Sequence, residues 1–167
     1  MKNKSIIGKE EWCSLPGLGL PLVKARVDTG AKTSALHAFN IFVYDENGKQ
    51  YVSFDVHPLQ GNKRIVRNCK AEVIDKRIVK NTSGRKEGRY VIKVPVSIGG
   101  HTWDIEVTLA NRDSMGYRML LGREALEKKF IIDPEHSFVS SDFSGKEIDS
   151  FYPDKKRRKE RIDDSSC

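Results

Sequence analysis

The chain has 167 residues and a formal net charge of +7, with 38% hydrophobic and 32% charged residues. This composition is typical of one globular domain, and no apolar run approaches the roughly 18 residues that cross a membrane. The basic N-terminus lacks the apolar stretch of a signal peptide, so we expect a cytoplasmic protein with no membrane partner. The three cysteines are widely spaced and form no Cys-x-x-Cys pair, which argues against a disulfide framework.

Short strands separated by turns dominate the first half of the chain. The strand expected at 23–27 leads directly into Asp28-Thr29-Gly30. Two β-prone runs, 41–44 and 51–56, flank a turn that contains Asn-Gly, and this pattern predicts a hairpin. Another strand-like segment covers 70–79, with a break in its apolar pattern at Asp75-Lys76-Arg77.

The second half repeats this pattern and adds the one helical signal. Residues 89–98 and 102–109 alternate apolar and polar side chains around Gly99-Gly100, which predicts a second hairpin. Only 123–129 looks helical, and a strand at 130–132 follows it. The expected fold class is therefore all-β, a small closed or partly open barrel with one short helix.

Charge divides the chain into a body and a tail. We expect one domain over residues 1–143 and a basic, flexible tail over residues 144–167. Most of the net positive charge belongs to the body, so the body itself is basic. A basic body favours acidic partners, such as nucleic acid, an acidic peptide or an anionic surface, and charge alone does not choose among them.

Two segments carry candidate chemistry. In the first, an apolar strand delivers Asp28 to the tight turn Thr29-Gly30-Ala31, which alone fits a structural turn equally well. In the second, Leu120-Leu121-Gly122 precedes Arg123 and a short helix, which alone fits a core strand that meets a helix. About ninety residues apart and in this order, the pair resembles the retropepsin family of aspartic proteases.

A closer resemblance covers more of the chain, from about Glu10 to Val139. It is to a bacterial family of retropepsin-like proteins that includes RimB and has long carried the label "ATP-dependent zinc protease". The segments that carry it are Glu11-Trp12, 15–20, 28–38, 89–92, 108–112 and 119–123.

This resemblance implies a retropepsin-like barrel with Asp28, Thr29 and Gly30 as catalytic residues. Aspartic proteolysis needs two carboxylates that share one proton, and the chain has one Asp-Thr-Gly. The second carboxylate should therefore be Asp28 of another copy across a two-fold axis, which implies a homodimer. Thr29 would brace the two loops, and Gly30 would allow close backbone approach. No cofactor is expected.

The substrate groove is expected to be basic. Arg26 lies two residues before Asp28, so both side chains should lie on one face of the strand. The expected substrate-binding residues are Arg26, Ala31, Lys32, Arg112, Arg118 and Arg123. Arginines bind carboxylates through two parallel hydrogen bonds, although these could also be ordinary surface charges. The resemblance also implies association with an ATP-grasp glutamate ligase and an acidic peptide or ribosomal protein tail as substrate; nucleic acid is a less expected partner.

One departure from the viral retropepsins affects the dimer. The residue after Asp-Thr-Gly-Ala is typically an aspartate that pairs with the late arginine, whereas Lys32 stands here and would repel Arg123. We expect Lys32 to meet Glu124 instead. The alternative function is a non-catalytic peptide-binding or protein-binding module on the same fold.

The sequence contains no motif that would support the words zinc or ATP in the family label. The four histidines, His37, His57, His101 and His136, are too far apart in sequence for a metal motif, so no metal site is expected. No phosphate-binding loop of the Gly-x-x-x-x-Gly-Lys-Ser/Thr type occurs either.

Overall fold

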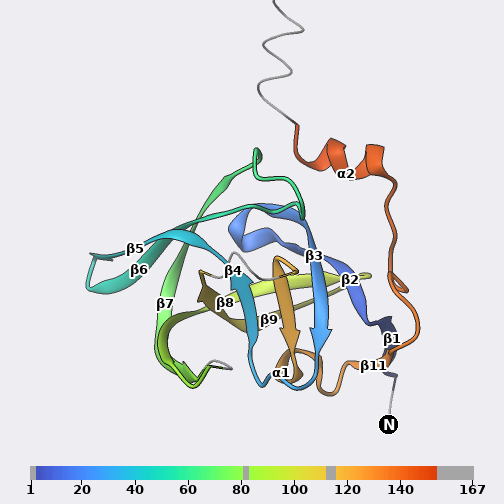
Figure 1. The fold of residues 1–167 in the computed structure, drawn as a ribbon, viewed down its shortest axis with the longest axis horizontal. Coiled ribbons are helices and arrows are strands. Elements are labelled where there is room, and N and C mark those ends of the chain that lie inside the picture. Colours follow the sequence, from blue (N-terminus) through green and yellow to red (C-terminus); the bar gives the residue numbers. More distant parts are fainter. Residues whose placement is uncertain (1–2, 81–82, 112–115, 154–167) are drawn as a thin grey trace, which may run out of the picture.

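A computed structural model describes residues 3–80, 83–111 and 116–153 of the chain. It contains eleven strands among these residues, which Figure 1 shows. Their bounds are β1 (Ser5–Gly8), β2 (Glu10–Leu15), β3 (Leu20–Asp28), β4 (Ser34–His37), β5 (Phe39–Glu46), β6 (Lys49–Val56), β7 (Arg67–Lys80), β8 (Lys86–Ile98), β9 (His101–Ala110), β10 (Met119–Gly122) and β11 (Phe130–Asp133). A 3-10 turn, η1 (Pro16–Leu18), and two helices, α1 (Arg123–Leu126) and α2 (Gly145–Phe151), complete the described elements.

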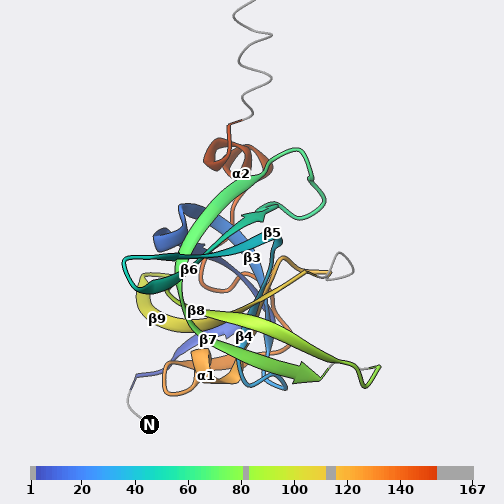
Figure 2. The same cartoon turned by 90° about the vertical axis from the view of Figure 1, so that its left-hand side faces the viewer.

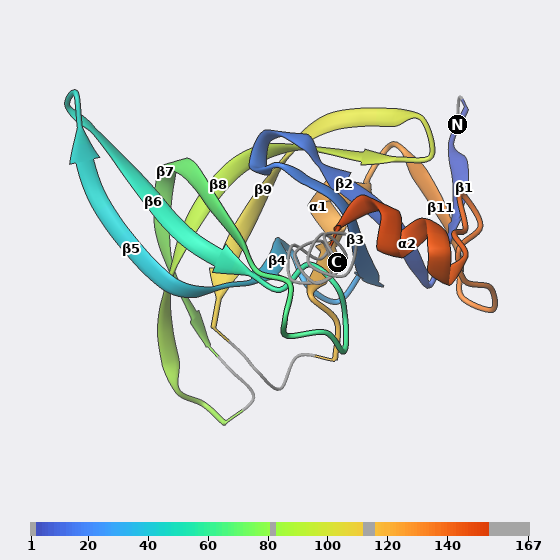
Figure 3. The ribbon, with the colours of Figure 1, turned by 90° about the horizontal axis from the view of Figure 1, so that it is seen from above.

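The strands form one large sheet and one small one. The nine-stranded sheet has the order β2-β3-β10-β4-β9-β8-β7-β6-β5, and β1 pairs with β11 in the second sheet. A single bridge between Ser14 and Ser97 joins β2 back to β8. The all-β prediction is confirmed, and the barrel is partly open, because a single residue pair joins β2 to β8. Strands β7, β6 and β5 continue the sheet beyond β8 (Figures 1 and 3).

Both predicted hairpins are present, and positive φ angles explain their turns. Asn47 and Gly48 have φ of 53° and 77°, as a two-residue hairpin turn requires. Gly99 and Gly100 play the same part between β8 and β9, with φ of 55° and 92°. The break predicted at residues 75–77 is a shift of register inside the continuous strand β7, between Val73 and Asp75. The long β7–β8 hairpin projects from the sheet in Figure 2.

Apolar residues form two clusters on opposite faces of β2 and β3. Alternate residues such as Cys13 and Val23 belong to the main core inside the curved sheet. Their neighbours Trp12 and Leu22 face the other way and pack with Leu59, Ile65 and Tyr152. Strand alternation thus lets one pair of strands cover two cores.

The helices correct two parts of the sequence analysis. The helix expected over 123–129 ends at Leu126, and α2 is a second helix that the sequence analysis did not predict. Helix α2 begins with a capping box between Ser144 and Glu147, and the Tyr152 side chain that follows it is buried against β3. The first part of the predicted tail therefore packs against the folded domain. Residues 154–167, its most basic part, lie outside the described residues, and their flexibility stays a prediction.

A buried carboxylate ties the C-terminal segment to the N-terminal strands. Glu11 is fully buried and accepts hydrogen bonds from the backbone N–H groups of Gly8 at 2.7 Å, Val139 at 2.9 Å and Ser140 at 3.1 Å. The Ser140 hydroxyl adds a fourth at 2.6 Å. Such a set of donors replaces the water that a carboxylate loses on burial.

No helix within the described residues is both long and apolar enough to span a membrane.

Candidate active site

The two motifs singled out in the sequence lie side by side in the sheet. Strand β3 ends at Asp28, and β10 runs parallel to it with Leu120 opposite Arg26 and Gly122 opposite Asp28. Strand β10 also pairs with β4 on its other side, so it is held between two neighbours. The sheet register thus brings a segment from late in the chain to the carboxylate at the end of β3.

Backbone hydrogen bonds lock the Asp28 turn to the second motif. The Ala31 N–H donates to the Asp28 carbonyl at 3.2 Å, which closes the turn. The Ala31 carbonyl accepts from the Arg123 N–H at 2.7 Å, and the Lys32 carbonyl accepts from the Glu124 N–H at 3.1 Å. These two carbonyls cap the first N–H groups of α1, which would otherwise lack partners.

Gly122 packs closely against the backbone of Thr33 and Ser34 behind the site. A Cβ atom on Gly122 would lie 2.5 Å from the carbonyl carbon of Thr33 and 2.8 Å from the Ser34 nitrogen, so only glycine fits. The Gly122 N–H donates to the buried Ser34 hydroxyl at 3.0 Å. The Ser34 carbonyl in turn accepts from the Thr108 hydroxyl of β9 at 3.2 Å.

Asp28 lines a pocket of about 480 Å³. Its carboxylate is half-buried at the end of β3, while Thr29 and Gly30 are exposed at the rim. The lining residues are Arg26, Val27, Asp28, Thr29, Gly116, Tyr117 and Leu120. Asp28 is the one acidic residue among them. The described residues of one copy therefore do not supply a pair of carboxylates to this pocket.

Arg26 shares the pocket with Asp28, as their two-residue spacing on β3 predicts. Its guanidinium carbon lies 5.9 Å from the centre of the Tyr117 ring. The Tyr117 hydroxyl donates to a carboxylate oxygen of Glu10, which is the cross-strand partner of Arg26 on β2. This hydrogen bond raises the pKa of Tyr117 above its ordinary value.

The other predicted binding residues have different environments. Lys32 pairs with Glu124 at 3.7 Å, as predicted, although both side chains are exposed and such a pair contributes little stability. Arg123 donates from Nη1 to the Thr29 carbonyl at 3.0 Å. Arg118 is buried, with 7% exposure, and does not line the pocket, whereas Arg112 lies outside the described residues.

Sequence patterns did not predict that Glu10, Ser34 and Tyr117 lie at or behind this site. Each depends on a contact between segments far apart in the chain: Glu10 with Tyr117, and Ser34 with Gly122. No spacing rule within one segment reveals such partners. The one available signal was that Ser34 lies within the segment that resembles the retropepsin-like family.

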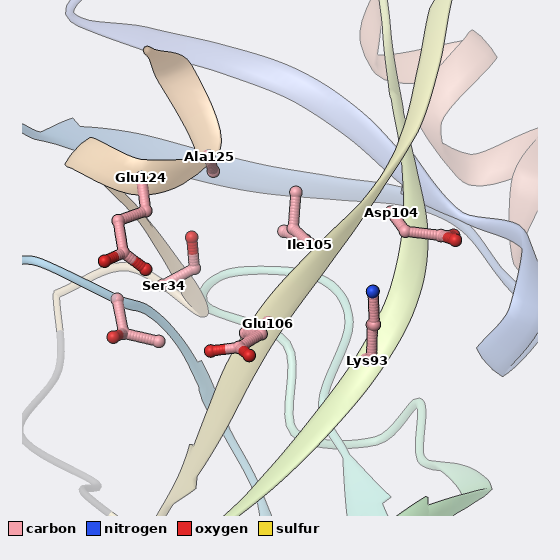
Figure 4. Close-up of a pocket in the computed structure, with 8 residues that line it drawn as sticks. Ser34, Lys93, Asp104, Ile105, Glu106, Glu124 and Ala125 are labelled. Carbon is pink, nitrogen blue, oxygen red and sulfur yellow. The ribbon is translucent and has the colours of Figure 1, made fainter. Parts of the chain in front are cut away.

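A second, smaller pocket lies beside α1. It has a volume of about 230 Å³ and is lined by Thr33, Ser34, Lys93, Asp104, Ile105, Glu106, Glu124 and Ala125. Figure 4 shows Glu106 and Glu124 on one side of it and Lys93 and Asp104 on the other. Glu106 already pairs with Arg77 at 2.8 Å, and Glu124 pairs with Lys32. These carboxylates are therefore engaged in ion pairs, and we assign the pocket no chemistry.

Three possible metal ligands gather in the turn after β11. Asp133, Glu135 and His136 place one ligand atom each within 4.8 Å of one another. The His136 ring nitrogen Nδ1 is 2.7 Å from Asp133, whose other oxygen accepts from the Glu135 N–H. These contacts lower the pKa of Asp133. They are hydrogen bonds within one turn that faces solvent. The expectation of no metal site stays a prediction.

Comparison with known proteins places this geometry among retropepsin-like proteins. A model of the RimB-like family, described as retropepsin-like aspartic endopeptidase RimB, matches residues 6–142. A solved structure of a Legionella pneumophila protein of unknown function is similar with a TM-score of 0.70 and 29% identity, and the match covers 83% of this chain and 100% of that one.

Curated relatives share most of this chain. A probable alpha-L-glutamate ligase of Shewanella halifaxensis is 49% identical over 157 residues, or 94% of this chain. A protein of the same name from Desulfotalea psychrophila is 51% identical over 156 residues, or 93% of this chain. The chain spans about a third of the length of these relatives, since the match covers 34% of each.

Proposed function

Because the chain belongs to the RimB-like family of retropepsin-like aspartic endopeptidases, we propose that it hydrolyses peptide bonds with Asp28 as the catalytic carboxylate. The observation that carries this proposal is the parallel pairing of β3 and β10, which sets Asp28 opposite Gly122 in a pocket of about 480 Å³. A pocket of this size accommodates one or two peptide side chains beside the carboxylate.

The proposed mechanism needs a second copy of the chain. Asp28 is the single acidic residue that lines the pocket within the described chain, and aspartic proteolysis uses two carboxylates. We place Asp28 of a partner copy opposite the first, across a two-fold axis. The ionised carboxylate takes a proton from water, whose oxygen attacks the carbonyl carbon, and the protonated carboxyl gives its proton to the carbonyl oxygen. The C–N bond then breaks as the first carboxyl gives the proton it took from water to the amine nitrogen, and a hydroxyl of the intermediate returns a proton to the second carboxylate.

Thr29 and Gly30 have supporting roles in this proposal. Both are exposed beside Asp28, where they would meet the same loop of the partner copy. A Cβ atom on Gly30 would lie 3.4 Å from the Asp28 carboxylate, so glycine keeps that side of the carboxylate open. The Thr29 carbonyl is fixed by Arg123, which supports the loop from behind.

We propose acidic peptides as the substrate class. Arg26 lines the pocket beside Asp28, and no carboxylate of the described residues forms an ion pair with it. Of the predicted cations, Lys32 and Arg123 have partners within the chain, so we assign the preference chiefly to Arg26. A guanidinium binds a carboxylate through two parallel hydrogen bonds.

The names of the relatives support the same substrate class. They are called probable alpha-L-glutamate ligases, and an enzyme of that name attaches glutamate. We therefore propose glutamate-rich peptides, including ribosomal protein tails, as substrates, and a functional association with such a ligase. A cytoplasmic location would agree with this role and stays a prediction.

A non-catalytic peptide-binding module is the second candidate. The observation in its favour is that the relatives are named as ligases, and that this chain spans only about a third of their length. A domain that holds the acidic product of a ligase would need Arg26 but not a pair of Asp28 carboxylates.

Digestion of a peptide library separates the two candidates. We expect the wild-type chain to cleave peptides rich in glutamate, and Asp28→Asn to lose about 10²–10⁴-fold in rate, as when a general acid or base is removed. Asp45→Asn, on the exposed β5–β6 hairpin, is the matched control and should cleave normally. Binding of acidic peptides without cleavage at any pH by a dimeric wild-type chain would rule out the peptidase.

A further inference from the structure

Three side chains from three strand regions meet at the wall of the Asp28 pocket. Arg26 of β3 stacks on the ring of Tyr117, just before β10, with its guanidinium carbon 5.9 Å from the ring centre. The Tyr117 hydroxyl donates to Glu10 at the start of β2. Arg26 and Tyr117 line the pocket, whereas Glu10 is not among its lining residues.

Glu10 is positioned to compete for Arg26. The two residues are directly opposite each other in the antiparallel pair of β2 and β3. Side chains in such positions have Cβ atoms about 4.5–5.5 Å apart, and opposite charges there attract. Even so, no ion pair joins Glu10 and Arg26, and a Glu10 oxygen accepts from Tyr117. The guanidinium keeps its fork of N–H donors for another acceptor.

The protonation state of Tyr117 allows its hydroxyl to keep donating to Glu10. Its hydrogen bond to Glu10, with smaller effects of burial and of the Glu10 charge, raises its pKa. The hydroxyl therefore stays protonated, and able to donate, throughout the neutral range. The ring meanwhile presents its face to Arg26, and a cation over a tyrosine face is attracted by the ring quadrupole.

We propose that Tyr117 determines the specificity of the pocket by holding Glu10 away from Arg26, so that the guanidinium binds a substrate carboxylate beside the scissile bond. This inference rests on the proposed function for its substrate class. Tyr117 is a positioning residue, since it acts through Glu10 and Arg26. The bound group is a glutamate or aspartate side chain.

A binding experiment tests the inference without turnover. Chains of residues 1–167 that all carry Asp28→Asn are titrated with a fluorescein-labelled tetraglutamate peptide and with a labelled tetraglutamine peptide of the same length. Tyr117→Phe keeps the ring but frees Glu10 to pair with Arg26, so tetraglutamate should bind about tenfold more weakly, as when one charge-assisted contact is lost. Tetraglutamine binding should not change.

The double variant separates this mechanism from a structural defect. In Glu10→Gln/Tyr117→Phe the competing carboxylate is gone, so tetraglutamate affinity should return to within about twofold of the reference. Arg26→Lys, which keeps the charge but loses the planar fork, should stay weak.

The outcomes distinguish this inference from the function on which it rests. If Tyr117→Phe binds tetraglutamate normally, or if the double variant binds no better than Tyr117→Phe, the role of Tyr117 is wrong while the substrate class stands. If the reference chain itself shows no preference for tetraglutamate over tetraglutamine, the proposed substrate class is wrong, and the inference with it.

Discussion

Gly122 lies directly opposite Asp28 in the parallel pairing of β3 and β10, and its N–H donates to the Ser34 hydroxyl at 3.0 Å. This relationship positions the end of β3 through the backbone of β10, which the buried Ser34 hydroxyl in turn holds in place. A change at Gly122 should therefore act on Asp28 without touching any group that meets the substrate.

Gly122→Ala should both destabilise the fold and reduce peptide hydrolysis. Its Cβ would lie 2.5 Å from the backbone of Thr33, so a strand must move, at a cost of about 1–3 kcal/mol. Chemical unfolding measures the first effect and the peptide assay the second. Gly145→Ala is the matched control, because a Cβ there meets nothing within 4 Å. Normal activity and stability of Gly122→Ala would contradict the packing described for this site.

Mixed dimers should reveal whether each site uses Asp28 from two copies. If wild-type and Asp28→Asn chains exchange freely at equal amounts, about one quarter of the dimers carry two intact carboxylates. The hydrolysis rate should then be about one quarter of the rate of the same total amount of wild-type protein. A rate of one half would show that each copy works alone, and the shared site would have to be abandoned.

The sequence predicted most strands because apolar alternation is a local pattern, as in the β8–β9 hairpin. That Asp28 lies near Gly122 was predicted from the resemblance that the two motifs carry together, and the β3–β10 register confirms it. Helix α2 was missed because it has only seven residues, none of them fully buried, and only Ile148 and Phe151 pack partly against the Trp12 and Leu22 cluster. It depends on the capping box of Ser144 and on Tyr152, which packs against residues more than a hundred positions away.

The wall of the candidate site could not be predicted for a related reason. The ion pair of Lys32 with Glu124 was predicted from their opposite charges and from their positions beside the two motifs. By contrast, Arg118 was predicted to bind substrate because it lies near the second motif, and the chain instead buries it outside the Asp28 pocket. Closeness along the chain says little about which face of a short strand a side chain occupies until the register is known.

Glu11→Gln should destabilise the protein strongly although the change is nearly isosteric. Three backbone N–H groups and one hydroxyl donate to the carboxylate, and an amide NH₂ group would face some of these donors. The expected loss is about 2–4 kcal/mol in the free energy of unfolding, measured with denaturant. Glu46→Gln at an exposed hairpin end is the control, with an expected change within about 0.5 kcal/mol. Equal stability of the two variants would refute the role of Glu11.

Stability should fall in alkaline solution partly because Cys13 is buried. Burial raises the pKa of the Cys13 thiol to about 12, whereas an unfolded thiol titrates near about 8.5. Above that pH the unfolded chain has lost a proton that the folded chain keeps, so rising pH favours unfolding. The slope is about 1.4 kcal/mol per pH unit for this thiol, between roughly pH 9 and 12. Cys13→Ala should show a slope that is smaller by this amount in unfolding curves at several pH values; an unchanged slope would contradict the burial of the thiol.

Tyr152 should determine whether the segment after residue 143 belongs to the folded body. Its hydroxyl donates to the Leu22 carbonyl at 2.6 Å and accepts from the Leu22 N–H at 3.1 Å. Tyr152→Phe leaves both buried groups of β3 without this partner, so unfolding should become easier by about 1–3 kcal/mol. Tyr44→Phe on the β5–β6 hairpin is the matched control and should change stability little. A chain that ends at residue 153 should keep its stability, whereas one that ends at residue 143 loses the ring from the Trp12 and Leu22 cluster and should unfold at lower denaturant. If the shorter chain were equally stable, the predicted boundary at residue 143 would be correct and the packing of α2 and Tyr152 would contribute nothing to the domain.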